Sequence, residues 1–156
     1  MLSTLWFVGK VDTTVSRGRS YGAVVDMTYP TICAYLYYDD PKALDWLVDV
    51  FGFTVRMRDV RPDGSLGHCE LALGDSVVML GTPDGYRGPD ADEPRRFGLF
   101  VHVDDVEAHF ARSRAKGARV QDSPTDQPYG VRSYGVLDLA GNQWWFAQPL
   151  AAGAPT

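Results

Sequence analysis

The chain has 156 residues, the length of one ordinary domain, and its 45% apolar and 22% charged residues exclude a disordered or fibrous protein. Its 15 basic and 20 acidic residues give a net charge of −5 with neutral histidines, the opposite of the basic surface that a nucleic-acid-binding protein needs. No apolar run reaches the ~20 residues that span a bilayer. We therefore expect neither a nucleic-acid partner nor a membrane segment.

The chain contains two cysteines, Cys33 and Cys69. Both lie in apolar, strand-like runs and lack the spacing of a metal site. We expect two buried free thiols, which suit a reducing compartment and predict a cytoplasmic protein.

The chain divides by composition and periodicity into an extension, a domain and a tail. Residues 1–28 have no strong periodicity and are predicted to be an N-terminal extension, whereas 151–156 form a small, proline-containing tail that we expect to fray. The domain, 29–150, is expected to consist of module one (29–81), a connector rich in Gly, Pro and charge (82–96) and module two (97–150).

Module one begins with a strand-like run at 31–38, followed by a helical pattern. Asp40 is expected to cap the helix and Gly52 to end it. The apolar positions recur at i, i+3, i+4 and i+7 and are Leu44, Leu47, Val48 and Phe51. Further strands are predicted at 53–59, 67–73 and 76–80, the last two joined by the turn residues Gly74 and Asp75.

Module two repeats this order of elements. A strand at 98–103 is followed by a helix at 106–116 that Gly117 ends, and in both modules the second residue of an Asp-Asp pair precedes the terminating glycine by 12 positions. Further strands are predicted at 118–121, 133–139 and 143–148, the last two joined by Gly141 and Asn142. Each module therefore reads β-α-β-β-β, and the predicted fold class is α+β.

Four stretches carry a resemblance to a known family: 43–53 (ALDWLVDVFGF), 68–80 (HCELALGDSVVML), 102–107 (HVDDVE) and 138–148 (DLAGNQWWFAQ). Their order and spacing resemble the vicinal oxygen chelate superfamily, which includes glyoxalase I, extradiol dioxygenases, fosfomycin-modifying enzymes and bleomycin-binding proteins. The resemblance implies two β-α-β-β-β modules that form one cup-shaped mixed sheet, the glyoxalase/bleomycin-resistance fold, and a homodimer.

Metal-dependent members of that superfamily hold a divalent cation through His, Glu or Gln side chains on the strands that line the cup. By the resemblance, the matching positions here are Ile32 (or Cys33), Gly98 (or Phe97), Trp145 and, in module one, Val78. None of them restores the family's ligands. We therefore expect no metal and no cofactor, and the chain resembles the metal-free glyoxalase-like and bleomycin-resistance branch.

Trp144 and Trp145 are adjacent on a predicted strand, so one faces the cup and the other the helices. By the resemblance Trp145 faces the cup, where its indole offers a stacking platform for a planar or cationic ligand. The alternative is that Trp145 fills the space of the lost metal. His102 has the strand parity of Gly98 and can either donate a hydrogen bond to a ligand or anchor the turn that follows.

Three further candidates for ligand binding lie on module one. His68 and Glu70 share a strand face, as an acid–base pair or residual metal ligands or, alternatively, as a strand-edge pair that faces solvent or closes a dimer interface. Tyr37 stands beside Tyr35 and Tyr38, of which at most two share a face, so some of these rings pack in the core and others line the cup or an interface.

In module two, Arg132 follows an aromatic-glycine stretch that relatives place in a loop over the cup. It can bind an anionic or carbonyl group, or pair with Asp122 or Asp126. His109 lies in the middle of the predicted helix, where we expect a solvated face.

The leading hypothesis is a metal-independent small-molecule-binding protein with a planar or cationic ligand, with antibiotic sequestration as one role, and not an enzyme. The alternative is a divalent-metal-dependent lyase, isomerase or dioxygenase of the same superfamily that uses His68, Glu70 and His102. A third possibility is that Trp145 and its neighbours fill the cup, so that no ligand enters and the chain is a structural or partner-binding protein.

Overall fold

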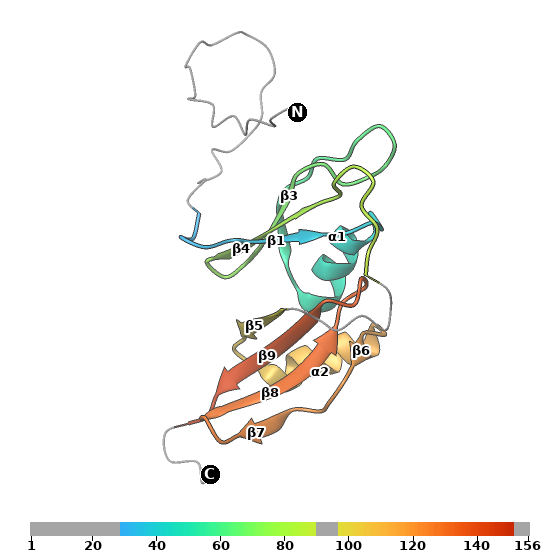
Figure 1. Ribbon diagram of the computed structural model, residues 1–156. Coiled ribbons are helices and arrows are strands. Elements are labelled where there is room, and N and C mark those ends of the chain that lie inside the picture. The colour runs from blue at the N-terminus through green and yellow to red at the C-terminus, as the bar shows by residue number, and fades with distance from the viewer. Residues whose placement is uncertain (1–28, 90–96, 152–156) are drawn as a thin grey trace.

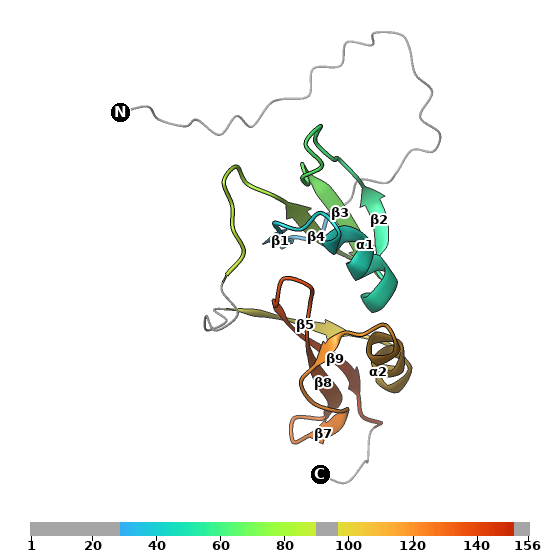
Figure 2. The same ribbon diagram turned by 90° about the vertical axis from the view of Figure 1, so that its right-hand side faces the viewer.

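The computed structural model describes residues 29–89 and 97–151. The predicted N-terminal extension, the end of the connector and residues 152–156 of the tail lie outside the described residues. Two mixed sheets, each with a helical segment beside it, make up the described chain (Figures 1 and 2). The predicted α+β fold class is confirmed.

The first sheet has the strand order β1-β4-β3-β2, with β1 parallel to β4 and the other neighbours antiparallel. Its elements are β1 (Ala34–Tyr37), α1 (Ala43–Trp46), the π-helical segment η1 (Leu47–Phe51), β2 (Thr54–Met57), β3 (Cys69–Leu73) and β4 (Ser76–Gly81).

The first helix ends at Gly52 as predicted, but its N-cap is Lys42 and not Asp40, which corrects the predicted start. The Asp40 side chain accepts a hydrogen bond of 2.9 Å from the backbone N–H of Lys42, and Gly52 ends the helix with a φ of +81°. Its last turn differs from the prediction because it is π-helical. The carbonyls of Val50 and Phe51 there have no partner in their own helix, and both accept hydrogen bonds from Arg112 of the second helix, at 3.1 and 2.9 Å.

The second sheet has the order β5-β9-β8-β6, with a short additional strand, β7, paired to β8. Its elements are β5 (Gly98–His102), α2 (Val106–Ala115), β6 (Arg119–Val120), β7 (Thr125–Gln127), β8 (Val131–Leu137) and β9 (Gln143–Pro149). Asp105 caps α2 by accepting from the N–H of Ala108 at 2.9 Å. The strand β7 was not predicted.

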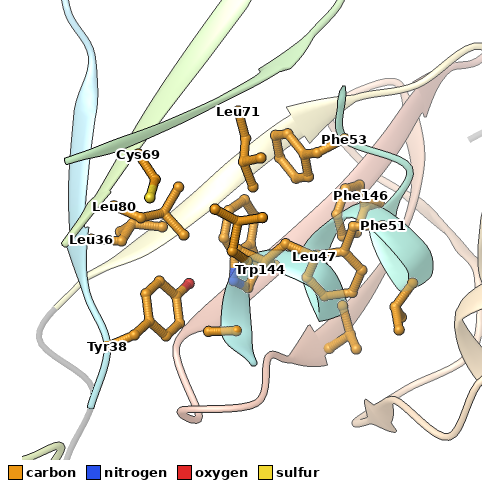
Figure 3. Close-up of a cluster of buried hydrophobic side chains, with 14 of the residues drawn as sticks. Leu36, Tyr38, Leu47, Phe51, Phe53, Cys69, Leu71, Leu80, Trp144 and Phe146 are labelled. Atoms are coloured by element: carbon orange, nitrogen blue, oxygen red, sulfur yellow. The ribbon is translucent and has the colours of Figure 1, made fainter. Parts of the chain in front are cut away.

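The core lies between the helices and the inner faces of both sheets (Figure 3). Phe51 of the first helix meets Phe146 of β9 edge to face, with 4.9 Å between ring centroids, and Trp144 stacks on Phe146. Leu36, Leu80 and Trp144 are at most 2% exposed. Burial of these side chains from both halves is the main free energy that holds the two sheets together.

A buried carboxylate also joins the halves. Asp138, in the turn between β8 and β9, accepts from the Tyr38 hydroxyl at 2.7 Å, from Trp144 Nε1 at 3.1 Å and from the side-chain amide of Asn142 at 2.9 Å. Tyr38 follows β1 and is 1% exposed. Asp138 lowers the cost of burying three polar groups at the contact between the two halves.

His109 is not on a solvated helix face, and that prediction is wrong. It is 7% exposed and lies against Phe146. Its Nε2 donates to the Phe51 carbonyl at 3.0 Å, and its Nδ1 is 2.7 Å from the Tyr134 hydroxyl, which also lies 3.0 Å from Ser113 Oγ. Burial lowers the pKa of His109 to about 4; the hydrogen bond to Phe51 opposes this and nearby Arg112 adds to it.

The cysteines are free thiols. Cys69 is buried, as predicted, and burial raises the pKa of its thiol. Cys33 is only half-buried, which corrects the prediction, because it precedes β1 instead of lying within the sheet. Among the described residues, no helix is long and apolar enough to cross a membrane.

Candidate functional site

The two faces of β9 differ in character. Trp144 and Phe146 point into the core, whereas Trp145 points the other way and is 38% exposed. Phe100 of β5 lies opposite Trp145 in register and is 46% exposed. His102 follows on the same face, with its ring centroid 5.5 Å from that of Phe100. The outer face of the second sheet thus presents three aromatic rings.

Trp145 occupies the space above Gly98. A Cβ at position 98 would lie 3.0 Å from Trp145 Cη2 and closer still to Cζ3. The outer face therefore accommodates the indole only because residue 98 has no side chain. Together these two residues leave no room for a metal-ligating side chain at position 98.

A cleft of about 900 Å³ lies beside this aromatic face. It lies between the two halves, bounded by the β3–β4 hairpin and residues 51–53 of the first half and by β5, α2 and the inward-facing Trp144 of the second. Phe100 and His102 line it, whereas Trp145 does not. Of the residues predicted to bind a ligand, His102 is the one that the structure places in the cleft.

The outer face of the first sheet carries a second aromatic group. Tyr35 and Tyr37 share this face and are 41% and 47% exposed, whereas Tyr38 is buried. The ring centroids of Tyr35 and Tyr37 are 5.4 Å apart. Tyr86 extends the row at one end, 5.7 Å from Tyr37, and His68 at the other, 5.7 Å from Tyr35.

His68 and Glu70 are hydrogen-bonded. His68 Nε2 donates to Glu70 Oε1 at 2.9 Å, since a carboxylate only accepts, and this leaves His68 Nδ1 to accept from the Tyr35 hydroxyl at 3.2 Å. The Tyr29 hydroxyl donates to the same oxygen, Oε1, at 2.8 Å. Burial acts to raise the pKa of Glu70, but the hydrogen bonds from His68 and Tyr29 outweigh it and hold this pKa below its usual value.

Arg132 lies in strand β8 and not in a loop. Its Nε donates to Glu107 at 2.7 Å and its Nη1 to Asp126 at 2.7 Å. The alternative of an ion pair with Asp126 is the arrangement observed, while Asp122 accepts from the backbone of Gly135. A ligand would have to compete with two carboxylates for this guanidinium.

The strand register corrects one of the predicted positions. Val78 pairs with Ala34 and Leu71 on the packed face of the first sheet, whereas Met79 shares the exposed face with Tyr35 and Glu70. The counterpart of Trp145 in the first sheet is therefore Met79 and not Val78. The two-residue β3–β4 turn is shorter than the β8–β9 connection, and turn length sets the face on which a strand resumes.

Two aromatic residues at these faces were not among the sequence candidates. Phe100 has the strand parity of Gly98 and His102, so alternation along β5 is a signal that could have found it. Tyr86 lies in the connector, where no periodicity exists to point to it. The structure does not bring His102 together with His68 and Glu70, because they lie on different sheets.

Comparison with known proteins gives one matching family. The sequence profile of the Glyoxalase/Bleomycin resistance protein/Dioxygenase superfamily matches residues 32–146. An uncharacterized protein of Mycobacterium bovis is 31% identical over 128 residues, which cover 78% of this chain and 84% of that protein.

Two solved structures are similar in fold and sequence. TioX from Micromonospora sp. ML1 has a TM-score of 0.63 and 36% identity, and the match covers 76% of this chain and 98% of TioX. TnmS3, an antibiotic binding protein from Streptomyces sp. CB03234, has a TM-score of 0.58 and 26% identity, and the match covers 78% of this chain and 98% of TnmS3.

Proposed function

Because the chain belongs to the glyoxalase/bleomycin resistance protein/dioxygenase superfamily, we propose that it is a metal-independent small-molecule-binding protein. The observation that carries this proposal is the exposed aromatic group of Trp145, Phe100 and His102 beside a cleft of about 900 Å³. Ligand sites are concave, mostly apolar and lined by aromatic side chains with few polar groups. One scaffold hosts several chemistries, so the residues of the site and not the fold determine the function.

The residues at the family's metal positions do not fit a metal. Ile32, Gly98 and Trp145 carry no metal-ligating atom, and the indole of Trp145 fills the space beside Gly98. Across residues 29–89 and 97–151, no group of three or more His, Cys, Asp or Glu side chains could hold a metal ion. No chemical step through a metal is therefore derived for this chain.

The ligand that suits these rings is planar or cationic, because both stack on the electron-rich faces of aromatic side chains. TnmS3, with which the chain shares 26% identity, is an antibiotic binding protein. Sequestration of an antibiotic is accordingly the role that we propose for binding. Such a role needs affinity and no turnover.

We further propose a homodimer. Tyr37 on the first sheet and Phe100 on the second are 47% and 46% exposed. Aromatic side chains that gather on an exposed face mark an interaction surface, and a second copy would cover part of both faces. Light scattering coupled to size exclusion gives the test: a single monomer mass at all concentrations would contradict the dimer.

The alternative is a divalent-metal-dependent lyase, isomerase or dioxygenase with relocated ligands. The hydrogen bond between His68 and Glu70 is the observation that favours it. His102, the third residue of that set, lies on the other sheet. A metal site of these three residues is not assembled within one chain.

Elemental analysis separates the two readings. The purified protein is dialysed with Fe, Mn, Ni or Zn in separate arms, and retained metal is measured per chain. We expect no stoichiometric metal in any arm. One tightly held metal per chain that His68→Ala abolishes would establish the alternative and overturn the proposal.

Ligand binding is then tested by tryptophan fluorescence and calorimetry with planar aromatic compounds. We expect Trp145→Leu to weaken binding by about 2- to 30-fold, since a stacking contact is worth about 0.5–2 kcal/mol. Trp46→Leu is the control for loss of a tryptophan, because Trp46 packs on Phe51 away from the outer faces. Equal affinities of the two variants would remove Trp145 from the site.

A further inference from the structure

A row of four rings crosses the outer face of the first sheet. Tyr86, Tyr37, Tyr35 and His68 follow one another at centroid distances of 5.7, 5.4 and 5.7 Å. These are the spacings of favourable ring pairs. Two of the rings are about half exposed, so the row is a surface that solvent reaches and not part of the core.

A buried carboxylate with an unused oxygen lies at the His68 end of the row. Glu70 is 1% exposed, and its Oε1 accepts from both His68 and Tyr29. Its Oε2 is buried and has no hydrogen-bond partner within the described part of the chain. A buried carboxylate oxygen without a donor is costly, and in native proteins it calls for a specific explanation.

We propose that this ring row and Glu70 form a cation-selective subsite, which takes a planar ligand that carries a protonated nitrogen. The proposal rests on the proposed function. It adds a second contact surface for the same kind of ligand, on the first sheet, and specifies the charge of that ligand. The rings supply a surface on which a flat molecule can stack. Glu70 supplies the negative charge, and its Oε2 supplies the acceptor.

One cation–π contact already exists beside Glu70, between Arg56 and the ring of Tyr29. The guanidinium carbon of Arg56 lies 5.0 Å from the centroid of the Tyr29 ring, next to the carboxylate that Tyr29 contacts. Arg56 thus shares the neighbourhood of Glu70, but it does not hydrogen-bond to Oε2. The oxygen is a buried acceptor without a donor, which a ligand can reach only if a neighbouring side chain moves.

Tyr29 is the side chain most able to give way to a ligand. It is 42% exposed, and a single hydrogen bond fixes its hydroxyl to Oε1. His68, by contrast, is held at both ring nitrogens. A donor therefore reaches Glu70 from the Tyr29 side while the His68–Tyr35 arm stays in place.

The experiment compares two planar probes of similar shape by calorimetry. Proflavine is cationic near neutral pH, and acridone is uncharged. We expect the full chain to bind proflavine at least about tenfold more tightly than acridone, a difference of about 1.4 kcal/mol. Glu70→Gln keeps the shape of the side chain and should remove this selectivity by weakening proflavine binding at least about tenfold more than acridone binding.

Two further variants locate the effect. Asp45→Asn removes one negative charge from an exposed position on α1, paired with Arg58, and should keep the selectivity. Tyr37→Leu removes an exposed ring of the row and should weaken both probes. Tyr37→Leu also keeps the test decisive if Glu70→Gln does not fold.

Failure of the subsite and failure of the proposed function give different results. Equal affinity of wild type for the two probes, or unchanged selectivity in Glu70→Gln, overturns the subsite and leaves a small-molecule binder. Loss of binding in Trp145→Leu but not in Tyr37→Leu overturns the ring row as the location. Absence of any binding by either probe overturns both proposals.

Discussion

The indole of Trp145 lies where a side chain at position 98 would be, so the two residues form one structural unit on the outer face of the second sheet. A Cβ on Gly98 would be 3.0 Å from Trp145 Cη2 and nearer to Cζ3. By the resemblance, both residues match positions where metal-dependent members of the superfamily carry ligands. A large side chain at position 145 of β9 is possible only when position 98 of β5 has no side chain.

Gly98→Ala should destabilise the protein by about 1–3 kcal/mol, since the new methyl group must displace the ring. Chemical denaturation measures this difference. Trp145→Leu should relieve most of the cost, so the double variant gives a coupling free energy of about 1 kcal/mol or more. Gly135→Ala is the matched control, because its Cβ would meet only the ends of flexible side chains, at 3.2 to 3.5 Å. Additive effects of Gly98→Ala and Trp145→Leu would contradict the coupling.

The hydrogen bond between Tyr38 and Asp138 should contribute measurably to the contact between the halves. Tyr38→Phe deletes a buried hydroxyl that donates to a carboxylate at 2.7 Å, at an expected cost of about 1–3 kcal/mol. Urea denaturation measures it. Tyr37→Phe, at a half-exposed position, should stay within about 0.5 kcal/mol of wild type. The hydrogen bond would be unimportant if both variants lost the same amount.

Stability should fall in mild acid because His109 is buried as the neutral ring. Burial lowers its pKa to about 4, from 6.5 in the unfolded chain, so the unfolded chain binds the additional proton between these values. The stabilisation is complete above pH 6.5 and is lost as the pH falls toward about 4. The gap corresponds to about 3 kcal/mol.

Unfolding free energies measured across this pH range test the assignment. His109→Gln should flatten the slope, while His102→Gln, at an exposed position, should keep it. An unchanged slope in His109→Gln would show that another group controls the acid response.

The two glycines that end the helices should differ in their tolerance of alanine. Gly52 and Gly117 have nearly the same φ, +81° and +78°, so the backbone strain of a substitution is the same, about 1–2 kcal/mol. At Gly117 the added Cβ would meet nothing within 4 Å, whereas at Gly52 it would lie 2.5 Å from Arg112 Nη2. Gly52→Ala should therefore cost more than Gly117→Ala in thermal unfolding, since Arg112 must leave the carbonyls of Val50 and Phe51. Equal costs would contradict the role given to Arg112.

The sequence carried the local structure well, because helix ends and hairpin turns are set by neighbouring residues. Asp105 accepts the backbone hydrogen bond that starts the second helix, and Gly52 and Gly117 end the two helices. Alternation along β9 also separates Trp144 from Trp145. These signals span only a few residues, so they need no knowledge of the rest of the chain.

Where the prediction failed, the deciding contact joins residues far apart in sequence. His109 was expected in solvent, but Phe51 and Tyr134 bind its two nitrogens from other elements. Val78 was taken for the counterpart of Trp145, but the two hairpins differ in length and shift the register by one residue. The sequence around His109 shows only a polar residue in a helix, and Val78 was located only by counting from Gly74. Neither pattern reveals contacts with distant parts of the chain.

The sequence by itself determined the α+β class and the glycines that end the two helices, since each depends on residue type at a known spacing. Only the tertiary structure decided which polar groups are buried and which rings meet. The β1–β4 pairing brings Tyr35 and Tyr37 to the face of Glu70, and a turn of the connector adds Tyr86 to their row. Burial and charge state depend on the folded surroundings of a group, because the free energy of ionising a carboxylate or an imidazole depends on every atom that replaces water around it.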